Sequence, residues 1–198
     1  MKKILFFLLL GFVLIPTEKI LADDDDKPFY KGIRVGWQQS NFSNSDWGDL
    51  SSFYAGFFGV KKIGLGKLLS FYSGLEFYQI GSQEDNDNKF VISYISVPIN
   101  LRVKVGPVYG FGGFNPSFKV MDEIIVGGVD ASEIILSNGN SIPFGVNAFD
   151  IGGQVGIGAK FLFLGVEVKY NQGFLDVFRD VTESTTSHHL QVGACVYF

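Results

Sequence analysis

Apolar and polar side chains alternate residue by residue through much of this sequence. In residues 91–105 the odd-numbered positions are apolar everywhere except at Ser93, whereas Asn100, Arg102 and Lys104 occupy even-numbered positions. A period of two is the period of a β-strand, in which neighbouring side chains point to opposite faces of a sheet. The pattern therefore predicts strands with one apolar face and one polar face.

Stretches of this kind recur along the chain. The links between them alternate between longer segments, the first of which covers residues 42–51, and tight turns such as Gly106-Pro107 and Leu162. Bacterial outer-membrane barrels combine an even number of strands with short periplasmic turns and longer outside loops. Residues 29–198 are therefore expected to form an all-β domain, an eight-stranded antiparallel transmembrane up-and-down β-barrel. Its predicted strands cover residues 29–41, 52–61, 67–81, 90–105, 107–119, 147–161, 163–174 and 187–198.

Alternation alone leaves open which face is outside, because a soluble lipocalin-like barrel with an apolar interior alternates too. The polar face is rich in small residues, as in Gly152, Gln154, Gly156, Gly158 and Lys160, and this suits a cramped lumen. Aromatic residues near the predicted strand ends also favour a membrane barrel, since such residues form girdles at membrane interfaces. The residues expected in these girdles are Tyr30, Trp37, Phe53, Tyr54, Tyr78, Tyr94, Phe118, Phe149, Phe161, Phe163, Tyr170, Phe174 and Tyr197.

Residues 1–22 follow a different pattern. Lys2 and Lys3 precede an apolar run over residues 4–15, which is shorter than the roughly 20 residues that a membrane-spanning helix needs. This predicts a secretory signal peptide at 1–22, followed by an acidic tether at 23–28. Its removal takes away three lysines and one glutamate, so the net charge changes from -4 to -6. An acidic chain argues against a nucleic-acid partner.

Cysteine usage limits the chemistry further. Cys195 is the only cysteine, so an internal disulfide is impossible and a structural zinc site would lack ligands. His188 and His189 are neighbours on a predicted strand and point to opposite faces, so they cannot easily share a metal ion. We expect these histidines to form the solvated foot of a loop, and we expect no cofactor, no metal and no catalytic residue.

Several short segments resemble one known family, the PorT-like outer-membrane β-barrel proteins of Gram-negative bacteria. The resemblance covers most of the chain after the signal peptide, and it implies an outer-membrane location without known catalytic residues. Some members of that family support a protein-secretion machinery. The segments that carry the resemblance are 73–78 followed by Gly81, 94–104, 106–110, 149–152, 168–173 and the terminal Tyr197-Phe198.

The charged residues of the polar face are the candidate site. An eight-stranded barrel has an interior just wide enough for side chains to fill, and an isolated ion in such a place costs several kcal/mol. We therefore expect these groups to form a bridged network that plugs the lumen, with a proton or ion path as the alternative. They are Arg34, Glu76, Arg102, Lys104, Asp150, Lys160, Glu167 and Lys169.

Three segments interrupt or extend the strand pattern. Pro98 lacks the N–H of a sheet ladder, so a bulge or a lost hydrogen bond is expected there. Residues 121–144 carry apolar triplets around turn residues and are expected to form either a hairpin whose edge recruits a protein partner or a loop that caps the barrel mouth. Tyr197 and Phe198 are expected to form the C-terminal signal for the barrel-assembly machinery.

These features favour a non-enzymatic, structural or accessory protein of the outer membrane with a side-chain-filled lumen, in contact with outer-membrane lipid. It would support protein secretion or surface assembly. The alternatives are a passive porin-like channel for small solutes and a soluble periplasmic lipocalin-like barrel that binds an apolar ligand.

Overall fold

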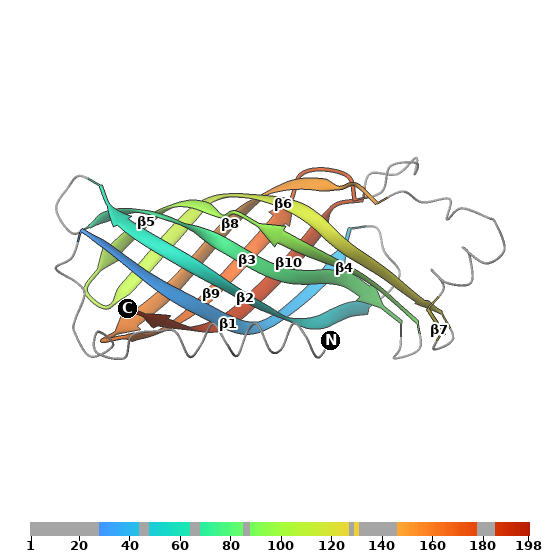
Figure 1. The fold of residues 1–198 in the computed structure, drawn as a ribbon, viewed down its shortest axis with the longest axis horizontal. Helices are drawn as coiled ribbons and strands as arrows, with labels where there is room; N and C mark the ends of the chain where they lie inside the picture. The colour runs from blue at the N-terminus through green and yellow to red at the C-terminus, as the bar shows by residue number, and fades with distance from the viewer. Residues whose placement is uncertain are drawn as a thin grey trace.

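The alternating stretches form the strands of one closed antiparallel sheet (Figure 1). The computed structural model describes residues 28–43, 48–63, 68–84, 88–126, 129–130, 146–177 and 185–198, so the predicted signal peptide and nearly all of the tether lie outside the described residues. The strands are β1 (Phe29–Phe42), β2 (Gly48–Lys62), β3 (Leu69–Gln83), β4 (Lys89–Ser96), β5 (Ile99–Val105), β6 (Val108–Val126), β7 (Val129–Asp130), β8 (Phe149–Phe161), β9 (Leu164–Gly173) and β10 (Ser187–Tyr197).

The wall of the barrel has eight strands. β4 and β5 lie end to end between β3 and β6 and together fill one position of the wall. β7, whose described pairing is with the end of β6, fills none. β1 pairs antiparallel with β10 and closes the sheet. The predicted fold class is confirmed. The described residues contain no helix long and apolar enough to cross a membrane.

The break between β4 and β5 falls at the predicted proline. β4 ends at Ser96 and β5 begins at Ile99, which leaves Val97 and Pro98 outside the regular ladder. The Val97 N–H still donates to the carbonyl oxygen of Pro116 at 3.0 Å. A proline in a closed barrel is thus accommodated by interrupting one strand while both of its halves remain paired.

Burial follows the alternation and decides which face is outside. Along β9, Leu164, Val166 and Val168 are exposed, whereas Glu167 and Lys169 are each 1% exposed. The apolar face therefore forms the outer wall and the polar face lines the lumen. A lipocalin-like barrel with an apolar interior is ruled out by this arrangement.

Five residues predicted for the aromatic girdles lie elsewhere. Tyr30, Tyr54, Tyr78, Tyr94 and Tyr197 are buried in the lumen, because they share the inward face of their strands with the glycines and charged residues. Of the other predicted residues, those exposed on the outer wall are Trp37, Phe53, Phe118, Phe149, Phe161, Tyr170 and Phe174.

The two ends of the barrel differ in their connections. Residues 106–107 and 162–163 form tight turns, helped by positive φ angles at Gly106 and Leu162, and the last strand ends near them. At the opposite end the link between β1 and β2 is shorter than predicted, since β2 begins at Gly48 rather than at residue 52. In contrast, β6 continues beyond the predicted residue 119 to Val126 and forms the hairpin with β7 (Figure 1). The second apolar triplet of the predicted hairpin, at 134–136, lies outside the described residues.

Two neighbouring glycines on β6 provide a test of the close strand packing. A methyl group at Gly113 would lie 2.0 Å from the carbonyl oxygen of Ile99, whereas one at Gly112 would lie 3.5 Å from the carbonyl oxygen of Gln154, an ordinary contact. We expect Gly113→Ala to lower the free energy of unfolding by about 1–3 kcal/mol, because the backbone must shift. Gly112→Ala should leave it unchanged or raise it by up to about 1 kcal/mol. Urea unfolding of the refolded barrel in detergent micelles measures both; equal losses would contradict the predicted packing.

Candidate functional site

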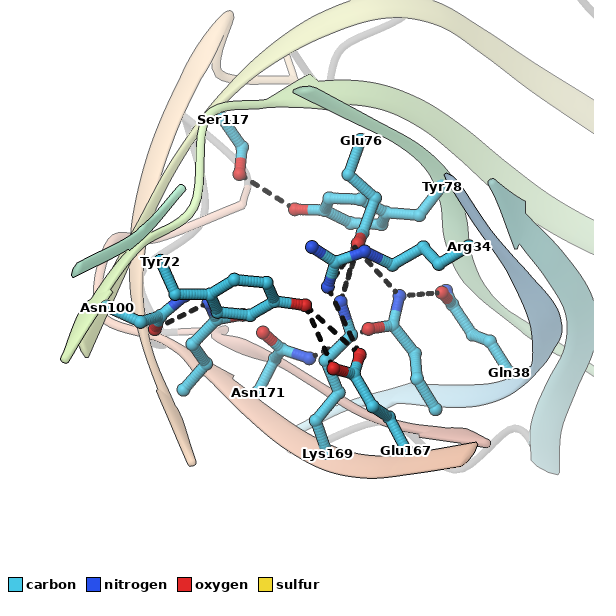
Figure 2. Close-up of polar contacts among 12 residues, drawn as sticks. Arg34, Gln38, Tyr72, Glu76, Tyr78, Asn100, Ser117, Glu167, Lys169 and Asn171 are labelled. Atoms are coloured by element: carbon cyan, nitrogen blue, oxygen red, sulfur yellow. Dashed lines mark hydrogen bonds and ion pairs between the residues drawn. The ribbon is translucent and has the colours of Figure 1, made fainter. Parts of the chain in front are cut away.

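Four charged side chains from three strands meet in the middle of the lumen (Figure 2). Lys169 Nζ on β9 donates to both carboxylate oxygens of Glu76 on β3, at 2.6 and 2.8 Å. Arg34 Nη1 on β1 lies 3.5 Å from a carboxylate oxygen of Glu76 and 3.5 Å from one of Glu167. All four are at most 2% exposed. Two anions and two cations therefore neutralise each other across the barrel.

Neutral side chains complete the coordination of the two carboxylates. The Tyr72 and Tyr109 hydroxyls donate to Glu167 at 3.0 and 2.8 Å. On the opposite side, Gln191 Nε2 donates to Gln38 Oε1 at 2.7 Å and to Glu76 Oε1 at 3.3 Å. These bonds tie β1, β3, β6, β9 and β10 together through their side chains. We call the four charged residues the central network.

Two apolar layers enclose the central network. The layer toward the tight-turn end consists of Tyr30, Phe58, Val60, Tyr72, Tyr109, Phe111, Cys195 and Tyr197. The layer toward the opposite end consists of Phe42, Tyr54, Tyr78, Ile80, Phe90, Ile92, Tyr94 and Val177, with Ile124 and Val146 packed against it. Side chains thus fill the lumen on both sides of the ion pairs, and this low-polarity setting strengthens the interaction between the charges.

Arg102 and Lys160 lie apart from the central network, within the apolar layer toward the tight-turn end. The guanidinium carbon of Arg102 is 3.4 Å from the ring centroid of Tyr109, and Lys160 Nζ is 5.2 Å from the rings of both Tyr30 and Tyr197. No described residue provides a hydrogen-bond acceptor for the fully buried Arg102 guanidinium. Aromatic faces therefore replace a carboxylate as its electrostatic partners, and such contacts contribute about 2 kcal/mol when they are desolvated.

The remaining two predicted residues lie near the ends of the lumen. Asp150, close to the start of β8, accepts a hydrogen bond of 3.5 Å from Ser187 Oγ. Lys104 is half-buried near the tight turn that follows β5. The barrel thus brings together four of the eight predicted charged residues and distributes the others along its axis. We propose that only Arg34, Glu76, Glu167 and Lys169 act as one unit.

Several inward-facing residues belong to the site although they are not among the eight charged residues predicted for it. Tyr72, Tyr109, Gln38 and Gln191 all occupy lumen positions of their strands, and this alternation is the signal that could have identified them. His189 was expected in a solvated loop foot, and that expectation is wrong. It is 3% exposed, and its ring centroid lies 4.9 Å from that of Tyr78.

The two C-terminal residues have different surroundings. Tyr197 is buried in the lumen, where its hydroxyl lies 2.9 Å from that of Tyr109. Phe198 is half-buried at the end of the wall, and its backbone exchanges hydrogen bonds of 3.1 and 2.9 Å with Lys31 of β1. The role of both residues as the C-terminal signal for barrel assembly stays a prediction.

An apolar outer wall around a buried polar interior defines a membrane-spanning β-barrel. The model of the outer membrane protein beta-barrel domain matches residues 22–179, and the chain belongs to this family. The protein is accordingly an eight-stranded barrel of the outer membrane, with its tight turns on the periplasmic side and its opposite end outside.

Comparison with solved structures finds similar chains at low sequence identity, and the first of them supports the fold. Neisserial surface protein A is 16% identical, with a TM-score of 0.55, and the match covers 86% of this chain and 97% of that one. Ail, the attachment invasion locus protein of Yersinia pestis, is 11% identical, with a TM-score of 0.48 and coverage of 85% and 98%. No match was found among the curated proteins.

The buried central network gives a stability prediction. We expect Glu76→Gln to lower the free energy of unfolding by about 3 kcal/mol, because it leaves Lys169 and Arg34 with an uncompensated buried charge. The matched control is Asp122→Asn, which breaks the partly exposed 3.0 Å ion pair between Lys119 and Asp122 and should cost less than about 1 kcal/mol. Urea titration of both variants in micelles makes the comparison; similar losses would show that the central network does not support the barrel.

Proposed function

We propose that this protein is a non-enzymatic, structural or accessory component of the outer membrane whose lumen is closed by side chains. One observation carries the proposal: the ion pairs of Arg34, Glu76 and Lys169 are buried between the two apolar layers. A passive channel for solutes needs a continuous aqueous path along the axis, whereas here side chains from most wall strands fill that axis. The layers also keep a substrate from the acidic and basic groups that could act on it.

We further propose an accessory role at the outer end of the barrel, in protein secretion or surface assembly. The resemblance to the PorT-like proteins supports this role, and the length of β6 supplies a surface for it. β6 pairs with β8 only as far as Phe118, yet it pairs with β4 up to Ile125. Val120 and Met121 are half-exposed on this extension. Residues 121–144 are therefore our candidate segment for a protein partner.

Conductance separates the closed barrel from a passive channel. We expect the refolded protein to produce no conductance steps in a planar lipid bilayer, because the axis is filled by packed side chains. Glu76→Gln should also stay silent, since the apolar layers on both sides of Glu76 do not depend on its charge. Stable steps of large amplitude in either protein would favour the channel.

Cross-linking in cells tests the partner at the outer end. A photo-reactive amino acid in place of Met121 is expected to give an adduct with another protein, because this exposed side chain lies on the extension of β6. The same substitution at Ser51, which is exposed on the outer half of β2, is the matched control and should give little adduct. No adduct at Met121, or equal adducts at both positions, would contradict a partner at this segment.

A further inference from the structure

The outer wall contains an apolar groove near the periplasmic rim. It has a volume of about 430 Å³, and its lining includes Phe29, Lys31, Phe57, Gly59, Leu75 and Phe198. The groove lies on the face that contacts lipid rather than in the lumen. It crosses β1, β2 and β3 close to the end where the tight turns lie.

The groove arises from small side chains at one level of the wall. Gly59 of β2 pairs with Lys31 of β1 and with Ser73 of β3. Gly59 itself adds no side chain, and the Phe29 ring lies over it, 3.0 Å from where a methyl group at Gly59 would be. On the neighbouring level Phe57 pairs with Leu75, and both are at least half exposed. The large side chains thus form a ridge that borders a shallow, apolar depression.

Positive charge gathers at the rim side of the groove. Lys31 is exposed, with its Nζ 5.8 Å from the Phe29 ring, and Lys61 is exposed on the adjoining strand opposite Phe29. The wall stretches 29–37, 53–62 and 69–75 contain no acidic residue, and the nearest acidic run along the sequence is the predicted tether before β1. The depression therefore combines an apolar floor with two lysines at the level where the membrane meets the periplasm.

We propose that this groove binds one phospholipid of the periplasmic leaflet that carries an anionic head group. An acyl chain lies against Phe29, Phe57 and Leu75, and the phosphate lies between Lys31 and Lys61. Lysine stems pack along apolar surface while their ammonium groups reach the head-group region, and each lysine near a membrane surface strengthens the binding of anionic lipid. A second copy of the barrel would cover the apolar floor but would leave the two lysines without a counter-charge.

Native mass spectrometry of the full barrel tests the proposal. The protein is refolded into vesicles of phosphatidylethanolamine and phosphatidylglycerol, extracted in mild detergent and analysed for retained lipid. We expect one retained phosphatidylglycerol per barrel. Lys31→Gln and Lys61→Gln should each lower the retained fraction about fivefold. Gly59→Leu, whose side chain pushes the Phe29 ring into the groove, should remove phosphatidylglycerol and phosphatidylethanolamine alike.

Ala194→Leu is the matched control, because Ala194 is an exposed small residue on the lipid-facing side of β10. It should retain lipid as the unmodified protein does. The lysine variants remain informative if Gly59→Leu does not fold, since they leave the wall packing unchanged. The proposal is overturned by absence of retained lipid, by equal retention in all variants, or by a dimer in place of a lipid adduct. None of these outcomes depends on whether the lumen conducts or the outside segment binds a partner.

Discussion

In the middle of the narrow lumen Arg34, Glu76, Glu167 and Lys169 each need a counter-charge, and the interior of the barrel is organised around that requirement. Glu76 lies between Lys169 and Arg34, and Arg34 also approaches Glu167. Because these residues come from β1, β3 and β9, each ion pair joins segments that the backbone ladder does not connect directly. The same contacts that neutralise the charges therefore hold opposite sides of the wall together.

Large rings and missing side chains complement each other on the inner face. A methyl group at Gly158 would lie 2.5 Å from the ring of Tyr109, and one at Gly193 would lie 2.2 Å from the Tyr54 hydroxyl. Glycines on one strand thus leave room for tyrosines that project from another. This complementarity lets the rings of the two apolar layers pack around the central network. It also explains why the polar face of the sequence is rich in glycine.

Local patterns predicted the strands, and non-local geometry determined the site. The alternation around Lys169 is sufficient to predict a strand and its inward face, because period two is a property of neighbouring residues. Glu76 and Lys169 are 93 residues apart, and their meeting depends on the register and the level of two distant strands. Asp150 shares the inward face but lies at another level, so residue type and face alone could not separate it from the central network.

Position near a strand end was a misleading signal where it conflicted with alternation. Tyr30 and Tyr197 lie near strand ends, which suggested a girdle. They occupy inward-facing positions of their strands, however, and therefore lie in the lumen. The second strand was predicted to begin at residue 52, although Leu50 and Ser51 already pair with Ser40 and Gln39 of β1. Following the alternation of inward-facing and outward-facing residues to the ends of each strand would have corrected both predictions.

Reactivity of the native cysteine tests the filled lumen most directly. Cys195, the only cysteine of the chain, is 1% exposed and packs within the apolar layer toward the tight-turn end, beside the central network. The folded barrel in micelles is treated with a small, charged methanethiosulfonate reagent, and labelling is compared with that of the boiled protein by mass spectrometry. The filled lumen predicts no labelling until the barrel unfolds. Equally fast labelling of folded and boiled protein would show a water-filled path along the axis and would contradict the closed interior.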